Sequence, residues 1–442
     1  MKTSTLINRA QKSGCRDQYG RNQPVSITVL ALFAIYYSLF ALPAMADEYH
    51  YNNILVGDRA AGMGGAYTAI SDDPSGLYYN PAGIVYAPGS NVSVSANAFH
   101  QSKVVYKNAL GNGMDYKRYS YALLPNFFGI VQPMGKGKVG FSYAVPDSIL
   151  EDQNQTFYAP NATTTRYAIN FNKNDNTYNF GPSYAQELSQ EFSVGLTLYA
   201  HYRKNQFISN QLINKTGGTY EWLNQFYNNT EWGIKPILGF MWSPTDKLST
   251  GLSVSKVNVV SSEIVAQTIC SGDAAGACLG VDTTYVLGAA PVRAKSLSEN
   301  KRGYPLTTTI GVAYFPSKTL IVSGDFSYYS KVKDSTFGDK EAIWNAALGV
   351  EYYLSEKLAL KGGLFTDKAN TPKITSTSVN ALDNVDLYGG SLSASYFTRQ
   401  SSITIGSTYR LGSGKAQILG GSQIQDLKSS VWTSFLSASY FY

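Results

Sequence analysis

The chain has 442 residues, and its 36 basic and 30 acidic side chains give a formal net charge of +6. Its first 46 residues hold five basic residues and one acid, or 5 − 1 = +4, so about +2 remains on the other 442 − 46 = 396 residues. Such a nearly balanced charge argues against a nucleic-acid partner, because nucleic-acid-binding proteins carry a strong basic surface.

The N-terminal segment has the features of a secretory signal peptide. Its basic residues are followed by a largely apolar run from Val25 to Leu42 and then by Ala44-Met45-Ala46. This order predicts cleavage after Ala46, so that residues 1–46 are removed. The alternative is an uncleaved anchor, since the apolar run is 18 residues long. No later segment has an apolar run of that length, which disfavours a bundle of membrane helices.

Residues 47–88 differ in composition from everything that follows. From Val56 to Gly83 the segment is rich in Gly and Ala and only weakly helical, with turns expected at 72–75 and at Asn80-Pro81. So many small residues indicate close packing against other backbone. We therefore expect this segment to fold as a plug inside the rest of the protein.

From residue 89 to the C-terminus, apolar residues alternate with polar or small ones. The apolar members of one such stretch are Phe192, Val194, Leu196, Leu198, Ala200 and Tyr202. This period of two places one face of a strand on lipid and the other on a wet lumen. We expect fourteen strands, over residues 89–100, 117–133, 136–146, 165–188, 190–204, 230–243, 247–259, 304–316, 318–331, 342–354, 356–367, 386–399, 401–411 and 430–442. Sixteen is the alternative, if 165–188 holds two short strands.

Longer polar stretches separate many of these strands and predict loops. They cover residues 148–163, 205–229, 261–303, 332–341, 368–385 and 412–429. Short turns at one end and long loops at the other are typical of outer-membrane barrels.

The final strand ends T-S-F-L-S-A-S-Y-F-Y at Tyr442, with Trp432, Leu436 and Tyr440 on one face. An aromatic C-terminal strand is usual in bacterial outer-membrane barrels, where it is recognised during assembly, so the barrel assembly machinery is an expected partner. The fold class we predict is all-β, a transmembrane antiparallel β-barrel over residues 89–442. The predicted location is the outer membrane of a Gram-negative bacterium.

Two cysteines remain once Cys15 leaves with the signal peptide. Cys270 and Cys278 flank S-G-D-A-A-G-A, and a disulfide between them is expected in an oxidising envelope. A metal site is the weaker alternative, because no His lies nearby and two ligands do not complete a site. Neither a metal nor a cofactor is expected.

The Gly-rich segment resembles the N-terminal hatch of the FadL-like family of long-chain fatty acid and hydrocarbon transporters. The resemblance rests on R-A-x-G-M-G-G-A, an Asp pair and Y-Y-N-P-A-G, and it extends loosely through the rest of the mature chain. The matching positions are Arg59, Gly62, Gly64, Gly65, Asp72, Asp73, Asn80, Pro81 and Ala82. The resemblance implies a monomeric fourteen-stranded barrel whose lumen is closed by a hatch, residues 47–88.

In such a protein a ligand is captured by extracellular loops and leaves sideways through a break in the third strand. Pro146 is the gate candidate here, because proline cannot donate to a sheet ladder. The alternative is that the strand simply ends at Pro146. The following residues, 146–152, are acidic and match the family poorly. For capture we expect the loop 205–229, through Phe207, Leu212, Trp222 and Phe226.

Several charged residues fall opposite the apolar faces of their strands, and we expect them in the lumen. They are His201, Arg203, Asp325, Glu351 and Lys361. Asp325, Glu351 and Lys361 are expected to pair with one another and with hatch residues such as Arg59. Direct contact with a ligand is the alternative, and His201 and Arg203 could meet a carboxylate.

The function implied by the resemblance is passive, diffusion-driven uptake of hydrophobic small molecules such as long-chain fatty acids or hydrocarbons. The alternative is a scaffold barrel serving a protein secretion system, whose relatives have a similar Gly-rich motif, and an aqueous porin comes third. We expect no enzyme activity, since the sequence has no G-x-S-x-G, H-E-x-x-H or P-loop. Besides the ligand, outer-membrane lipid and lipopolysaccharide are expected partners.

Overall fold

The computed structural model describes residues 49–111, 113–272, 292–296, 301–418 and 422–442. The predicted signal peptide, residues 1–46, lies outside the described residues. Among the residues that the structure describes, no helix is long and apolar enough to cross a membrane.

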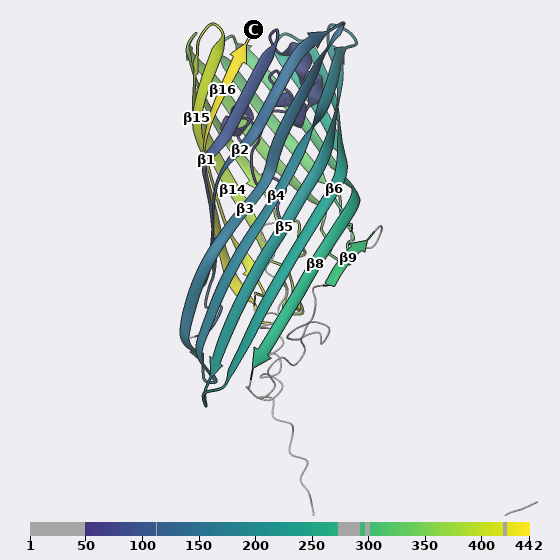
Figure 1. Ribbon diagram of the computed structural model, residues 1–442. Helices are drawn as coiled ribbons and strands as arrows, with labels where there is room; N and C mark the ends of the chain where they lie inside the picture. Colours follow the sequence, from purple (N-terminus) through teal and green to yellow (C-terminus); the bar gives the residue numbers. More distant parts are fainter. Residues whose placement is uncertain (1–48, 112, 273–291, 297–300, 419–421) are drawn as a thin grey trace, which may run out of the picture.

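The described residues form a closed antiparallel β-barrel, which is preceded in the sequence by a segment with three short helices (Figure 1). The helices are α2 (Asp58–Gly62), α3 (Gly76–Tyr79) and the 3-10 helix η1 (Pro81–Tyr86). The strands are β1 (Asn91–Tyr106), β2 (Tyr116–Met134), β3 (Gly137–Asn161), β4 (Thr164–Glu187), β5 (Phe192–Lys215), β6 (Tyr220–Thr245), β7 (Leu248–Ser255), β8 (Asn258–Gly272), β9 (Val292–Ser296), β10 (Thr307–Ser317), β11 (Leu320–Tyr329), β12 (Ile343–Ser355), β13 (Leu358–Asp367), β14 (Asn384–Phe397), β15 (Ser401–Ala416) and β16 (Gln425–Phe441).

These strands fill fourteen positions in the barrel wall. β7 and β8 share one position, because both pair with β6, and the strand direction is interrupted only at residues 256–257. Within the described residues, β9 pairs with β8 alone and lies outside the wall. β1 pairs with β16 and closes the ring. The fourteen-strand prediction is therefore confirmed, and the sixteen-strand alternative is wrong because residues 165–188 form a single strand, β4.

The strands β3, β5, β6 and β8 extend beyond the predicted bounds, and the predicted loops there are wrong, whereas β4 has nearly the predicted bounds. Residues 148–161, 205–215, 220–229 and 261–272 are strand, so that this side of the wall extends well beyond the rest (Figure 1). In these stretches polar and apolar residues are mixed on both faces. They therefore lack the regular alternation of a lipid-facing strand, although their backbone continues the ladder.

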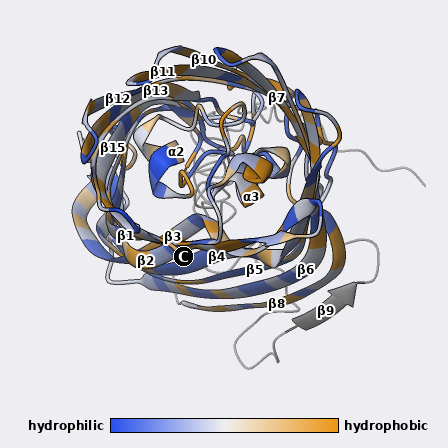
Figure 2. Ribbon diagram, turned by 90° about the horizontal axis from the view of Figure 1, so that it is seen from above, coloured by the Kyte–Doolittle hydropathy of each residue, from blue (hydrophilic) through white to orange (hydrophobic). Residues whose placement is uncertain are grey.

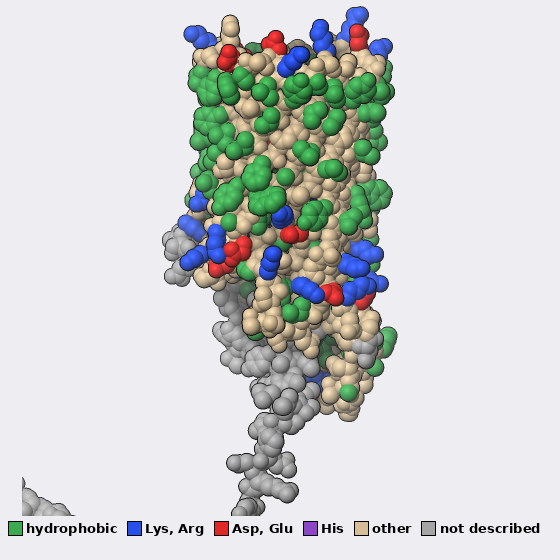
Figure 3. Space-filling model, turned by 180° about the vertical axis from the view of Figure 1, so that it is seen from behind, with side chains coloured by type: hydrophobic (Ala, Val, Ile, Leu, Met, Phe, Trp, Pro, Cys, Tyr) green, Lys and Arg blue, Asp and Glu red, His purple; other side chains and the backbone are tan. Residues whose placement is uncertain are grey.

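A band of apolar side chains covers the outside of the barrel between two rings of charge (Figure 3). The exposed residues of this band include Leu196, Leu198, Leu348, Leu392 and Ile405. Towards the long end of the barrel the band finishes in aromatic rings, where Tyr202 contacts Tyr178 at 6.0 Å and Trp232 at 4.4 Å between ring centroids. An apolar belt with aromatic girdles is the surface that a membrane-spanning barrel presents to lipid.

The N-terminal segment lies inside this barrel, near the end with the short turns (Figures 1 and 2). η1 contacts β3, β4, β5 and β6, while α2 contacts β13 to β16 on the opposite side. Val56, Met63, Tyr67 and Leu77 are fully buried. The segment therefore packs against both sides of the lumen at the same level.

Glycines of the wall allow the backbone of this segment to approach closely. A Cβ atom added at Gly195 of β5 would overlap the backbone of Pro81, and one at Gly363 of β13 would overlap that of Met63. At Gly251 of β7 the clash would be with the carbonyl oxygen of Thr68. The close packing predicted from the Gly- and Ala-rich composition of the segment therefore also depends on glycines of the wall.

Candidate functional site

A buried ion-pair network joins α2 to the barrel wall. Arg59 Nε lies 2.8 Å from Glu351 Oε2 of β12, and its Nη1 contacts Asp72. Glu351 Oε1 lies 3.8 Å from Lys361 Nζ of β13. Glu351 and Lys361 are both buried. The structure therefore brings together three of the charged residues singled out in the sequence, and their partners are other protein groups.

Asp325 of β11 holds the loop that follows α2. Its Oδ2 atom accepts hydrogen bonds from the backbone N–H groups of Tyr67, at 3.1 Å, and Thr68, at 2.9 Å. Gly64 and Gly65 precede this loop with φ angles of 68° and 88°, in the left-handed region that glycine adopts readily. On the other side of the lumen, Ser391 Oγ donates to the carbonyl oxygen of Gly62 at 2.8 Å.

The Asp72-Asp73 pair forms a turn before α3. Asp73 Oδ1 accepts from the backbone N–H of Ser75 at 2.7 Å and from its Oγ at 2.5 Å. Burial, reinforced by the nearby carboxylate of Asp58, raises the pKa of Asp73 to about 6 although Arg59 opposes the shift. Tyr67 Oη donates to Asp72 at 3.2 Å.

Asn80 fixes the start of η1 to the wall. Its Nδ2 group donates to the carbonyl oxygens of Thr68, at 2.8 Å, and Phe240 of β6, at 3.0 Å. Its Oδ1 atom accepts from the N–H of Ala82 at 3.1 Å, as a helix-capping side chain does, with Pro81 at the first helical position. The Asn80-Pro81-Ala82 motif therefore combines a cap with an anchor.

The wall has an unpaired stretch next to Pro146. β2 and β3 pair continuously from Met134/Gly137 to Phe127/Ala144, and beyond that only Ser120 pairs with Glu151. Residues 121–126 of β2 and 145–150 of β3 thus face each other without ladder pairing, and we call this stretch the β2–β3 seam. On its other edge, the pairing of β3 with β4 shifts register between Ala144 and Asp147. β3 continues to Asn161, so the alternative that the strand ends at Pro146 is wrong.

The N-terminal segment contacts β3 at this seam. Ile54 N donates to the carbonyl oxygen of Pro146 at 3.0 Å, and Asn53 Nδ2 donates to Asp147 Oδ1 at 3.1 Å. On the β2 side, Leu123 is 78% exposed, so an apolar side chain lies open at the outer face of the seam. The two contacts from the N-terminal segment take the place of part of the missing strand pairing.

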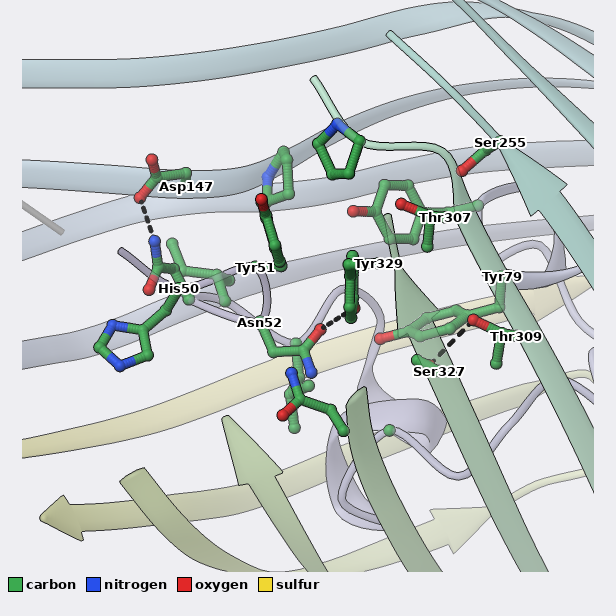
Figure 4. Close-up of a pocket in the computed structure, with 18 of the residues that line it drawn as sticks. His50, Tyr51, Asn52, Tyr79, Asp147, Ser255, Thr307, Thr309, Ser327 and Tyr329 are labelled. Carbon is green, nitrogen blue, oxygen red and sulfur yellow. Dashed lines mark hydrogen bonds between the residues drawn. The ribbon is translucent and has the colours of Figure 1, made fainter. Parts of the chain in front are cut away.

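A cavity of about 250 Å³ lies between the N-terminal segment and the wall, and it reaches Pro146 and Asp147 (Figure 4). Tyrosines are its main aromatic lining, and Tyr51 stacks on Tyr329 at 4.4 Å. Tyr329 Oη donates to Asn52 Oδ1 at 3.2 Å, and Thr309 and Ser327 are hydrogen-bonded at 2.9 Å. The tyrosines that line it are Tyr51, Tyr78, Tyr79, Tyr304 and Tyr329.

The predicted lumen residues of β5 also line this cavity. Arg203 forms a two-armed ion pair with Asp175 of β4, at 2.9 Å from Nε and 2.8 Å from Nη2. His201 Nδ1 lies 3.0 Å from Asn179 Oδ1, and the side chain is buried. Both residues therefore face inward as expected, and Arg203 is already neutralised by a carboxylate.

Sequence reasoning missed Lys235, which lines the same cavity. Its Nζ atom lies 4.6 Å from the centroid of the Tyr78 ring of α3. The signal was present, because Lys235 falls between Ile234 and Pro236 on a strand whose even-numbered residues face lipid. Counting the inward positions of β6 would have found it.

The four predicted capture residues lie on strands, so they do not form one loop surface. Phe207 of β5 is buried on the inner face, where it stacks on Phe171 at 6.2 Å and Tyr227 at 5.1 Å. Leu212, Trp222 and Phe226 have the opposite parity in the same hairpin and face outward. All four residues are apolar, but the strand pairing places Phe207 on the inner face of the barrel and the other three on the outer face.

Cys270, near the end of β8, is disulfide-bonded and buried. Cys278 lies outside the described residues, so the pairing of Cys270 with Cys278 stays a prediction.

Solved structures with the same architecture include a toluene transporter, a FadL homologue and a monoaromatic hydrocarbon channel. The Pseudomonas putida toluene transporter TodX superposes with a TM-score of 0.61 at 12% identity, over 87% of this chain and 97% of its own. A FadL homologue of Pseudomonas aeruginosa gives a TM-score of 0.59 at 14% identity, over 87% and 98%. The chain has the fold of the FadL family.

The monoaromatic hydrocarbon channel CymD gives a TM-score of 0.58 at 14% identity, over 89% of this chain and 99% of its own. The likeness to FadL barrels thus covers nearly the whole length of each neighbour. No protein-family model matches this chain, and no curated protein sequence matches it. The geometry is that of a Gram-negative outer-membrane barrel of the FadL type, with sequence similarity too low to carry over the role of any residue.

Proposed function

We propose that this FadL-type barrel is a passive channel that takes up hydrophobic small molecules across the outer membrane, without catalysing a reaction. One observation carries the proposal. The cavity beside the N-terminal segment is lined by Pro146 and Asp147, directly at the unpaired β2–β3 seam. A ligand in this cavity has a short path through the wall into the lipid phase.

The N-terminal segment acts as a hatch in this proposal, with residues 47–88 as its extent. Arg59, Asp325 and Asn80 tie it to the wall on both sides of the lumen, and the wall glycines leave little space beside it. A hatch fixed in this way blocks a straight aqueous path. The exit through the seam is therefore favoured over a porin-like route.

For capture we propose a second cavity of about 580 Å³ at the opposite end of the barrel. Its apolar lining comes from Ala109, Leu110, Tyr167, Ile213 and Ile424. These residues belong to the segment after β1, to β4, to β5 and to the segment before β16. This cavity would be the apolar capture surface that the sequence suggested. Phe207, which faces inward, would extend the apolar lining along the lumen.

We further propose that the outer face of the long strands contacts the saccharide of lipopolysaccharide. One row across four strands consists of Asn154, Asn170, Asn210 and Asn224, and Asn224 donates to Asn210. The row lies beyond the aromatic girdle, where saccharide surrounds an outer-membrane barrel. Amides donate and accept at once, as sugar hydroxyls do. Recognition of β16 by the barrel assembly machinery stays a proposal as well.

Flux into proteoliposomes with lipopolysaccharide in the outer leaflet tests the channel proposal, because the saccharide layer hinders hydrophobic solutes that cross a plain phospholipid bilayer unaided. The purified barrel should admit toluene or oleate at a rate well above that of empty liposomes of the same composition and should exclude arabinose, a polar solute of similar size to toluene. Arabinose entering as fast as toluene would indicate an aqueous porin. No flux of either solute, together with a stably co-purifying secretion protein, would favour the scaffold alternative.

A further inference from the structure

The cavity at the seam carries charge that a neutral hydrocarbon would not use. Five basic side chains and two carboxylates line it. They are Arg203, Lys235, Lys256, Arg302, Lys340, Asp147 and Asp325. The chamber that a ligand would occupy is therefore cationic.

Most of these charges are already matched by protein groups. Arg203 is paired with Asp175, and Arg302 Nε lies 3.1 Å from Glu231 Oε1. Asp325 accepts two backbone N–H groups from the hatch. For Lys235, no carboxylate lies within ion-pair distance of its Nζ atom among the residues that the structure describes, and the atom lies 4.6 Å from the centroid of the Tyr78 ring. Lys256 likewise has no such carboxylate among them, but its side chain is exposed to water.

Lys235 is half-buried, so its ammonium group loses part of its hydration. Its side chain points from β6 into the lumen and lies beside α3, which belongs to the hatch. Removing an ammonium group from water is unfavourable unless an opposite charge replaces the lost hydration. A single cation–π contact restores only part of that interaction. An anionic group on the ligand would supply the rest.

The size and lining of the cavity limit the rest of the ligand. An apolar cavity of about 150 Å³ is enough to hold benzene, so about 250 Å³ suits one ring with a substituent. Tyr51, Tyr79 and Tyr329 offer aromatic faces and edges to such a ring. An extended long-chain fatty acid would have to place most of its tail elsewhere.

We propose that this cavity binds a monocyclic aromatic acid, with its ring among the tyrosines and its carboxylate directed to Lys235. The inference rests on the proposed channel function, because it assigns a substrate class to the same path. It makes the barrel selective for small aromatic anions over neutral compounds of the same shape.

Binding of benzoate and of benzamide, its uncharged isostere, to the detergent-purified full chain tests this assignment. Lys235→Met removes the cation at similar length, Lys235→Arg keeps it, and Lys204→Met is the matched control on an exposed lysine of β5. Heat-modifiable migration in gels checks that each variant forms the barrel.

We expect Lys235→Met to weaken benzoate binding by about tenfold or more, as loss of a charge-assisted hydrogen bond does, and to leave benzamide unchanged. Lys235→Arg and Lys204→Met should bind benzoate nearly as the native protein does. Equal binding of benzoate by the native protein and Lys235→Met would overturn the carboxylate site while leaving the channel in place. If toluene and oleate fail to permeate and benzoate and benzamide fail to bind, the channel proposal falls together with this one.

Discussion

The hatch and the β2–β3 seam lie side by side, and they are held in opposite ways. Residues 56–86 are fixed by buried ion pairs, by backbone hydrogen bonds to Asp325 and by close backbone packing at wall glycines. At the seam, six residues of β2 and six of β3 lack ladder pairing, and the contacts from the N-terminal segment include those of Ile54 and Asn53 with β3 and of Leu55 with Asn126 of β2. The contrast supports the proposal that a ligand leaves through the wall and not through the hatch.

Breaking the hatch network should have the largest effect. Arg59→Leu removes the 2.8 Å ion pair of the buried Glu351 and leaves Lys361, at 3.8 Å, as a more distant cation; breaking a buried ion pair costs about 3–5 kcal/mol. We expect the hatch to loosen, so that planar bilayers containing the variant show steady ion conductance.

Lys331→Ala is the matched control for Arg59→Leu, because the Lys331–Glu341 pair is exposed. It should leave the bilayers silent. Bilayers that stay equally silent with Arg59→Leu would show that the ion pairs do not hold the hatch in place.

Filling the close contact between hatch and wall should have a smaller effect. Gly195→Val would push side-chain atoms into the backbone of Pro81, and overpacking of this kind costs about 1–3 kcal/mol. Hydrogen exchange of residues 76–86 should speed up. Gly362→Val, where the nearest atom to an added Cβ lies at an ordinary contact distance of 3.5 Å, controls for the loss of glycine from a strand. Unchanged exchange in Gly195→Val would contradict the tight packing described here.

Acidic pH should stabilise the hatch modestly, by about 1 kcal/mol between pH 7.5 and pH 5. Burial raises the pKa of Asp73 to about 6, above its ordinary value. Asp73 therefore binds a proton more tightly when the hatch is folded in the lumen than when the hatch is released. The stabilisation grows as pH falls through 6 and levels off near the ordinary pKa of an aspartate, at about 4. Protease protection of residues 56–86 should therefore be greater at pH 5, and Asp73→Asn should reduce the difference. A pH dependence that persists in Asp73→Asn must come from another group.

Weakening the link between hatch and seam should have the smallest effect. Asn53→Ala removes the hydrogen bond to Asp147, which is worth about 1 kcal/mol. Exchange of the amides in residues 145–150 should rise slightly while that of residues 137–144 stays unchanged. Equal changes in both stretches would mean that β3 responds as a single strand.

The sequence was informative wherever one face of a strand meets lipid. Alternation around Leu196 and Leu348 located all fourteen wall positions, because apolar residues recur there at every second position. It failed where polar and apolar residues are mixed on both faces, as between Gln206 and Asn228, since such a strand has the composition of a loop. Pairing between strands decides that case, and pairing is not local information.

The site was predictable only in part for the same reason. Pro146 and Arg59 stand out as residue types, and the structure places both at the hatch. The extent of the seam depends on β2 as much as on β3. In residues 121–126 Pro125 is a signal of the same kind as Pro146, but a single proline does not give the length of the unpaired stretch. In the described part of the chain, Lys235 has no carboxylate within ion-pair distance because nearby carboxylates such as Asp175 and Glu231 pair with other cations. Which charges pair depends on how the strands assemble around the lumen, and the sequence alone does not give this.

Covalent closure of the seam tests the central claim most directly. Leu123 and Ser148 would face each other if the register of the flanking pairs continued across the seam. A double cysteine variant at these positions, bridged by a reducible bis-thiosulfonate reagent, is compared with Ile130→Cys/Phe141→Cys in the paired part of the same two strands. We expect the bridge at the seam to lower toluene flux to that of empty liposomes. Reduction of the bridge should restore the flux, and the control bridge should leave the flux unchanged. Undiminished flux through the bridged seam would contradict a lateral exit.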